Sequence, residues 1–343
     1  MTEKYIPTTP APRQDVRVID IHGHAGTPKA EALIAQRPEF GAGMKMMAEG
    51  IGGPSMKHNG EVMLPRAGAR FANLEQRMTD LDNMGIDMQV VCPSPHIYSY
   101  WADEALATDL CGLANEAMVD IVAQGAGRIA ALGIVSLQHP ELAATQIRDL
   151  MAAGLKGFEI STAVGPLELS DASLDLVWQT AEETGAVVFI HPLGTSLGKR
   201  LNRDYLSNTI GQPAETTIAL SHMIFAGVFD RYPNLRVLAA HGGGYLPHYI
   251  GRSDHAWSVR PEIASCANLP SSYLRKIWFD TVLFDDKYLG YLIDNIGADR
   301  VAFGTDYAFD MGDYDVDRLA KSIGDDNTRA AVMGGTAASL LNL

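Results

Sequence analysis

Short apolar runs alternate with helical stretches along the chain, and this alternation constrains the fold more than any other feature of the sequence. The runs are rich in β-branched residues, which is typical of buried strands, and eight of them lie near residues 18–24, 88–93, 129–135, 156–160, 187–191, 236–241, 277–280 and 300–306. Helices are expected over residues 73–84, 103–124, 140–153, 172–184 and 214–230. Helices between strands give right-handed parallel crossovers that cover the outer face of a sheet. The pattern predicts an α/β fold, a closed (β/α)8 TIM barrel of the metal-dependent hydrolase type, with an open doubly wound sheet as the alternative.

Neither a domain boundary nor a repeat stands out in the sequence, so we expect a single domain over residues 1–343. Residues 1–15 form a polar, proline-containing N-terminal tail without the apolar core of a signal peptide. Residues 25–70 are rich in glycine and methionine and form a long insertion after the first strand. Because insertions of this length are usually functional, we expect an inserted loop region that acts as a lid or a binding loop.

The net charge of −14 limits the classes of partner. A chain with this charge repels polyanions and lacks a basic stripe, so nucleic acid is not expected as a partner. A small anionic substrate is compatible with the charge where local arginines or a metal overcome the overall field. No apolar stretch approaches the ~18–20 residues of a membrane helix, so we expect a cytoplasmic protein that does not bind membranes. Cys92, Cys111 and Cys266 are widely spaced and odd in number, which favours reduced buried thiols.

Side chains that can bind metal follow several of the predicted strands, at the point where each strand ends. His22 and His24 end the first strand, and because side chains alternate along a strand, both point the same way. The fifth strand ends in His191, the sixth in His241 and the eighth in Asp306. The carboxyl ends of barrel strands meet at one mouth, where barrel enzymes assemble their active sites. One histidine at a strand end is usually just a polar residue, but five such groups predict a shared site.

The types of donor atom indicate which of these residues bind a metal and which is free to transfer protons. Three imidazoles and one carboxylate, from His22, His24, His191 and Asp306, suit one divalent metal ion, Zn²⁺ first, with Mn²⁺ or Fe²⁺ as alternatives. His241 is then free to move protons beside the metal, and its alternative roles are a fifth ligand or a pocket wall. A metal would also acidify a bound water. One metal and no organic cofactor are therefore expected.

Four motifs carry a family resemblance that covers nearly the whole chain. They are His-x-His on the first strand, His-Pro after the fifth, His241-Gly242-Gly243-Gly244 after the sixth and Gly304-Thr305-Asp306-Tyr307 after the eighth. The sequence thereby resembles the amidohydrolase superfamily (amidohydrolase family 2), in its aminocarboxymuconate-semialdehyde decarboxylase-related branch. The resemblance implies one zinc held by the four residues above and His241 as the catalytic acid/base. We expect Asp306 to be catalytic as well, because it would orient water while binding the metal.

The resemblance also implies a homodimer in which two arginines, one from each subunit, hold an anionic substrate. Arg252 matches the arginine contributed across the interface, with a surface salt bridge as its alternative role. The arginine of the first loop falls near Arg66, with Arg70 as a rival. Trp101, in an aromatic loop after the second strand, and Phe309, after the eighth, are further candidates for substrate contact. Trp101 is equally able to cover the core.

The expected function is non-oxidative, metal-dependent decarboxylation of a small unsaturated or aromatic carboxylic acid in aromatic-compound catabolism. Arginine forks match a carboxylate, and a cation with a protonated His241 would stabilise the charge left on carbon. Leu193 and Ala308 stand where the family decarboxylase has Trp and Pro. A metal-dependent hydratase or C–C hydrolase acting on a related ring-cleavage product is therefore the alternative. A non-catalytic barrel that binds a small acid is an alternative of a different class.

Overall fold

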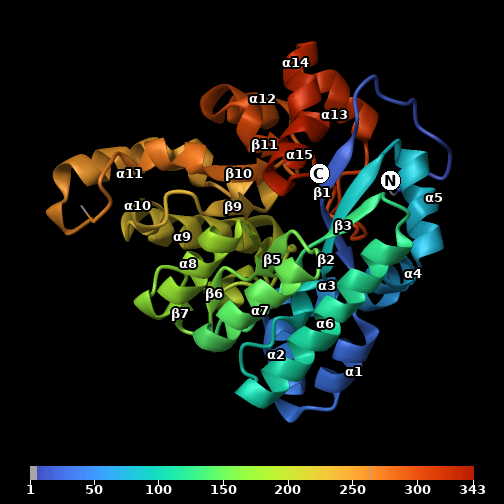
Figure 1. The fold of residues 1–343 in the computed structure, drawn as a ribbon, viewed down its shortest axis with the longest axis horizontal. Helices are drawn as coiled ribbons and strands as arrows, with labels where there is room; N and C mark the ends of the chain where they lie inside the picture. Colours follow the sequence, from blue (N-terminus) through green and yellow to red (C-terminus); the bar gives the residue numbers. More distant parts are fainter. Residues whose placement is uncertain (1–5, 264) are drawn as a thin grey trace.

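The computed structural model describes residues 6–263 and 265–343 (Figure 1). The strands are β1 (Ile19–Ala25), β2 (Met88–Pro93), β3 (Ile129–Ala131), β4 (Gly133–Ile134), β5 (Gly157–Ile160), β6 (Ala163–Val164), β7 (Leu167–Glu168), β8 (Val187–Ile190), β9 (Arg236–Ala239), β10 (Ile277–Asp280) and β11 (Val301–Ala302). The helices are α1 (Pro28–Ala35), α2 (Pro38–Ile51), α3 (Gly53–His58), α4 (Leu64–Ala72), α5 (Leu74–Met84), α6 (Glu104–Gln124), α7 (Pro140–Ala152), α8 (Asp175–Thr184), α9 (Gln212–Phe225), α10 (Val228–Arg231), α11 (Leu246–Val259), α12 (Asp286–Ile296), α13 (Val316–Ser322), α14 (Asp326–Ala330) and α15 (Thr336–Leu341).

The strands close into a parallel barrel, which confirms the predicted (β/α)8 architecture. One sheet has the order β1-β2-β3 and the other the order β11-β10-β9-β8-β5-β4. They join where β3 continues into β4 past Leu132, whose N–H donates to the Val91 carbonyl at 2.8 Å. At the other seam Gly23 pairs in parallel with Tyr307, and the Ile21 N–H donates to the Phe303 carbonyl at 2.8 Å. The second seam returns the sheet to β1, so the open-sheet alternative is wrong.

Alternate residues of the strands feed two buried clusters. Val188 and Ile190 of β8 belong to a cluster that includes Trp178 of α8, on the helix-covered side of the sheet. Val187 and Phe189 belong instead to a cluster with residues of β1, β9 and β11. Because neighbouring side chains on a strand point to opposite faces, the second cluster fills the barrel interior.

The insertion after β1 is helical, which corrects the loop expected over residues 25–70. Helices α1 to α4 and a π-helical turn at Asn59–Met63 cover it, and α1 packs beside α6 (Figure 1). Helices α1, α2 and α3 each have a proline in the first turn, where the missing N–H would have no partner anyway. Gly41 and Gly43 lie inside α2, where an added Cβ would meet nothing within 4 Å. These glycines lie on helix faces that contact nothing else, and in the sequence they interrupt the apolar pattern that would have predicted a helix.

Two further segments bear on the sequence predictions. Of the predicted tail, residues 1–5 lie outside the described residues, while Ile6 is buried and Arg13 pairs with Asp87 at 2.8 Å. Helix α11 extends outward from the barrel beyond β9 and β10 (Figure 1). Within the described part of the chain, no helix is long and apolar enough to cross a membrane.

Candidate metal centre

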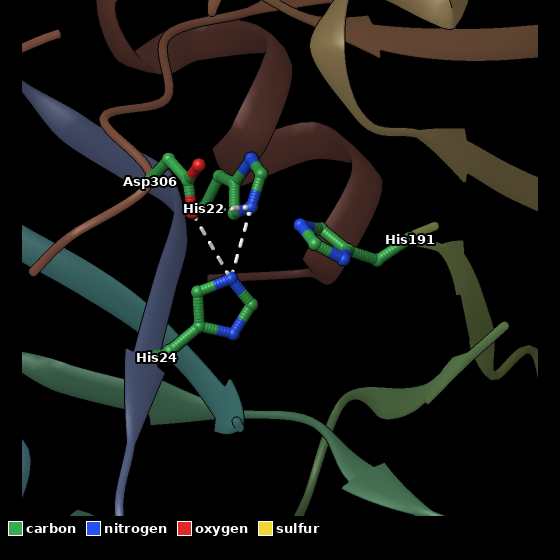
Figure 2. Close-up of side chains that lie close together, drawn as sticks. All are labelled: His22, His24, His191 and Asp306. Carbon is green, nitrogen blue, oxygen red and sulfur yellow. Dashed lines mark hydrogen bonds and ion pairs between the residues drawn. The ribbon is translucent and has the colours of Figure 1, made fainter. Parts of the chain in front are cut away.

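Three histidines and one aspartate converge at the mouth of the barrel (Figure 2). His22 and His24 lie on β1, His191 directly follows β8, and Asp306 follows β11. One nitrogen or oxygen atom from each lies within 4.8 Å of the others, and all four residues are buried. We call them the four-residue cluster. The structure thus brings together all four predicted metal ligands.

The separations among His22, His24 and Asp306 match those between ligands of one ion. The Nε2 atoms of His22 and His24 are 3.2 Å apart. The Asp306 Oδ1 atom lies 3.4 Å from His22 Nε2 and 3.2 Å from His24 Nε2. Nitrogen and oxygen ligands at about 2.0–2.2 Å from a tetrahedral zinc ion lie roughly 3.3–3.6 Å from one another. The residues therefore fit one divalent metal ion.

Buried polar atoms without hydrogen-bond partners provide an independent test of whether these residues suit a metal ion. Both ring nitrogens of His191 and the Oδ1 atom of Asp306 are buried and have no hydrogen-bond partner among the described residues. Leaving such atoms unpaired costs about 1–3 kcal/mol each. All three belong to residues of the cluster, and a cation between them would satisfy His191 and Asp306 together.

The charge states of His191 and Asp306 also suit a metal. Burial lowers the pKa of His191 well below its ordinary value, and the neighbouring His24 and His241 lower it further, so this imidazole is neutral. Burial alone would raise the pKa of Asp306, but the neighbouring imidazoles of His22 and His24 hold it well below its ordinary value. Neutral imidazoles and an ionised carboxylate are the forms that bind metal.

His241 stands beside the cluster but outside it. Its Nε2 atom lies 3.6 Å from Asp306 Oδ2, the carboxylate oxygen that faces away from His22 and His24. Its side chain is 15% exposed, whereas the side chains of His22 and His24 are fully buried. Burial lowers the pKa of His241, but the attraction of the neighbouring Asp306 carboxylate outweighs this and raises it overall. An imidazole that reaches solvent and holds a proton readily can exchange protons with a bound molecule.

A cavity of about 420 Å³ opens above His241 and Asp306. Its wall is aromatic and amide in character and includes Asn208, Gln212, Tyr245, His248, Tyr249, Phe284 and Tyr288. The volume suits a single small ring, which the aromatic side chains would contact through their faces.

The substrate-binding residues predicted from the sequence lie in different places. The Phe309 ring is 5.4 Å from the His24 ring and so borders the cluster. Trp101 is 37% exposed at the surface and is not among the residues that line the cavity. Arg66 is exposed on α4, and its rival Arg70 is tied to Asp80 by an ion pair of 2.8 Å. Arg252 is exposed on α11, one turn beyond the lining residue His248.

Sequence reasoning missed several buried residues that surround the cluster. Asp280 ends β10 and lies 2.7 Å from His22 Nδ1; its place at a strand end was the same signal that identified His191 and Asp306. On the other side, Cys92 and Glu159 lie 3.5 and 3.7 Å from His24 Nδ1. Burial raises the pKa of Glu159 to about 7. A lone carboxylate inside an apolar strand was the signal for Glu159.

A buried arginine also stabilises the backbone next to the four-residue cluster. Arg77 of α5 donates to the His24 carbonyl at 2.5 Å and to Gln89 Oε1 at 2.6 Å. Its guanidinium also lies 4.5 Å from the centre of the Tyr307 ring. These contacts hold the end of β1 against the segment after β11. The histidines of β1 and Asp306 therefore keep their spacing.

The fold and the site together define a metal-dependent barrel enzyme of the hydrolase type. The chain belongs to the amidohydrolase family, whose model matches residues 19–343. The 2-amino-3-carboxymuconate-6-semialdehyde decarboxylase of Dictyostelium discoideum is 35% identical over 272 residues, which cover 78% of this chain and 76% of that protein. The γ-resorcylate decarboxylase of a Polaromonas strain is 24% identical over 295 residues, which cover 81% and 90%. The family resemblance expected from the motifs is confirmed.

A solved structure agrees with the fold. The 5-carboxyvanillate decarboxylase of Novosphingobium aromaticivorans, complexed with manganese and 4-hydroxy-3-methoxy-5-nitrobenzoic acid, superposes with a TM-score of 0.83. The two chains are 21% identical, and each is covered over 100% of its length. At this identity the similarity establishes the barrel architecture.

Proposed function

We propose that the protein is a metal-dependent, non-oxidative decarboxylase of a small aromatic or unsaturated carboxylic acid, acting in the breakdown of aromatic compounds. The observation that carries this proposal is the four-residue cluster beside an aromatic-lined cavity, which Asp306 of the cluster and the neighbouring His241 both line. Relatives named as decarboxylases, one of them 35% identical, support the reaction type.

The residues of the site fit the requirements of decarboxylation. A divalent metal, when bound, supplies positive charge where the substrate's oxygens and the departing carboxylate must be held. The carbon that loses CO2 needs a replacement proton, and His241 stands where it can deliver one into the cavity. The aromatic walls exclude water from a planar ring, which strengthens the electrostatic interactions beside the cluster.

Zinc is the proposed metal. Three imidazoles and one carboxylate form a donor set typical of zinc. The spacing of the His22, His24 and Asp306 donor atoms matches a four-coordinate ion. Manganese is the rival, because nitrogen and oxygen sites discriminate weakly among divalent ions and a structural neighbour carries it. Metal analysis of the purified protein, followed by activity after reconstitution with each ion, would distinguish the two.

We also propose a homodimer in which Arg252 contacts the substrate in the partner's cavity. Arg252 is exposed on α11, the helix that carries the lining residues His248 and Tyr249, and α11 extends away from its own barrel (Figure 1). An arginine at the partner's cavity would provide the positive charge that an anionic substrate needs against a net charge of −14.

The reaction is tested with the three acids for which the relatives are named: 2-amino-3-carboxymuconate-6-semialdehyde, γ-resorcylate and 5-carboxyvanillate. In deuterated water, decarboxylation releases CO2 into the headspace and gives a product that carries deuterium in place of the carboxyl group. A product heavier by one water, without CO2, would instead favour the hydratase. Absence of turnover in the metal-loaded protein with all three acids would contradict this substrate class.

A further inference from the structure

A fully buried carboxylate outside the four-residue cluster joins a predicted metal ligand to the segment of His241. Asp280 Oδ2 lies 2.7 Å from His22 Nδ1 and accepts the His241 N–H at 3.0 Å. Its Oδ1 atom accepts the N–H groups of Gly242 at 2.9 Å and Val282 at 3.1 Å. A carboxylate offers about four acceptor positions, so these contacts occupy all of them. The one side chain among the donors is the imidazole of His22.

This contact selects one tautomer of His22. A neutral imidazole carries a single N–H, and an ionised carboxylate can only accept, so the proton lies on Nδ1. The lone pair then lies on Nε2, the atom that faces His24 Nε2 at 3.2 Å and Asp306 Oδ1 at 3.4 Å. The contact from His24 Nδ1 to the Pro93 carbonyl is longer, at 3.4 Å. Among the described histidines of the cluster, His22 therefore has the tightest constraint on its tautomer.

The same carboxylate holds the backbone that carries the predicted acid/base. His241 has φ of 54° and Gly242 has φ of 60°, both in the left-handed region, which costs energy for a residue with a side chain. Asp280 accepts the N–H of both residues. These bonds hold the turn in the conformation that places the His241 imidazole beside Asp306.

We propose that Asp280 is a positioning residue that fixes the metal-binding tautomer of His22 and the backbone of His241 together. One carboxylate thereby keeps the metal ligand and the proton donor in a fixed relation. The inference rests on the metal site of the proposed function and not on the reaction that the site performs.

The test replaces the carboxylate with an amide of the same shape. In Asp280→Asn the amide oxygen can still accept from the backbone, but the NH2 group can only donate. His22 can pair with this NH2 group only through a lone pair on Nδ1. Its proton must then move to Nε2, which can no longer bind the metal. Asp20→Asn is the matched control. Asp20 is also fully buried, but its contacts are the N–H groups of His22 and Thr305, the Thr305 hydroxyl and the Gln89 amide, with no imidazole among them.

Zinc affinity is measured by chelator competition on the folded variants, with circular dichroism as the check of folding. We expect Asp280→Asn to bind zinc about 10–100-fold more weakly than wild type, and Asp20→Asn to stay within about threefold while losing thermal stability. Equal losses in the two folded variants would overturn the proposal, because a lost buried charge would then explain both. Unchanged affinity in Asp280→Asn would also overturn it.

A measurement on the wild-type protein keeps the proposal testable if Asp280→Asn does not fold. In ¹⁵N-histidine-labelled, zinc-loaded protein, His22 should show its proton on Nδ1. A proton on Nε2 would overturn the proposal. Normal zinc binding and the expected tautomer without any CO2 release would leave Asp280 in its role and contradict the proposed reaction alone.

Discussion

The two histidines of β1 are predicted to be essential for metal binding and dispensable for folding. His22→Ala and His24→Ala each remove one nitrogen from a cluster whose atoms lie within 4.8 Å of one another. Three remaining ligands hold zinc weakly, so we expect metal content to fall from about one ion per chain to near zero. Elemental analysis beside a circular dichroism spectrum measures both properties.

His222→Ala is the matched control for these variants, because His222 is a half-exposed histidine that pairs with Glu168 away from the cluster. It should retain full metal content. Full occupancy in a His22→Ala, His24→Ala double variant would show that the metal, if any, binds elsewhere.

His241 should act on protons without holding the metal. Its Nε2 atom contacts Asp306 through the oxygen that faces away from the other ligands, so His241→Asn leaves the four-residue cluster intact. We expect normal metal content and a rate lower by ~10²–10⁴-fold. His248→Asn provides the comparison, because His248 also lines the cavity and should affect mainly the KM. Loss of metal from His241→Asn would make this residue a ligand instead.

Individual residues were predictable where one strand positioned them and less predictable where several segments did. Alternation along β1 was sufficient to place His22 and His24 on one side, because this parity is a local property of the backbone. Asp280 occupies an equivalent strand end but is surrounded by backbone N–H groups from a segment about 40 positions away in sequence. The surroundings of Trp101 were also hard to predict, since its exposure depends on the packing of the whole aromatic loop.

A substitution in helix α2 tests whether its glycines are the reason that the sequence of the inserted segment did not predict a helix. Gly41 is exposed inside α2, with nothing within 4 Å of an added Cβ. Gly41→Ala should therefore stabilise the protein by about 0.5–1 kcal/mol, because alanine has the higher helix propensity and a less disordered unfolded state. The midpoint of urea unfolding measures the change.

Gly52→Ala is the opposite case at the end of the same helix. Gly52 has φ of 90°, and an added Cβ would stand 1.8 Å from the Asn202 carbonyl oxygen. We expect destabilisation by more than about 1 kcal/mol. Equal effects of the two substitutions would show that α2 is not folded as the structure has it.

The repeated elements of the whole molecule were predictable from local patterns, whereas its closure was predictable only indirectly, from the number of strand-and-helix units. Each strand-and-helix unit is recognisable in the sequence by its local apolar pattern, and eight such units are compatible with few architectures. Closure depends on contacts such as the bridge from Gly23 to Tyr307, which join the first and last strands. No local pattern specifies that pairing, because it follows from the tilt and twist accumulated over all the strands.

The assembled protein is predicted to share its sites between two subunits, and complementation tests this directly. If Arg252 serves the partner's cavity, Arg252→Ala and His241→Asn chains are each inactive alone. A heterodimer of the two has one site with a normal His241 and a normal partner Arg252, and one site that lacks both. Random mixing makes half of the dimers heterodimers with one working site of two, so about a quarter of wild-type activity should return. Native mass spectrometry verifies subunit exchange, and exchange without recovered activity would place Arg252 outside the partner's site.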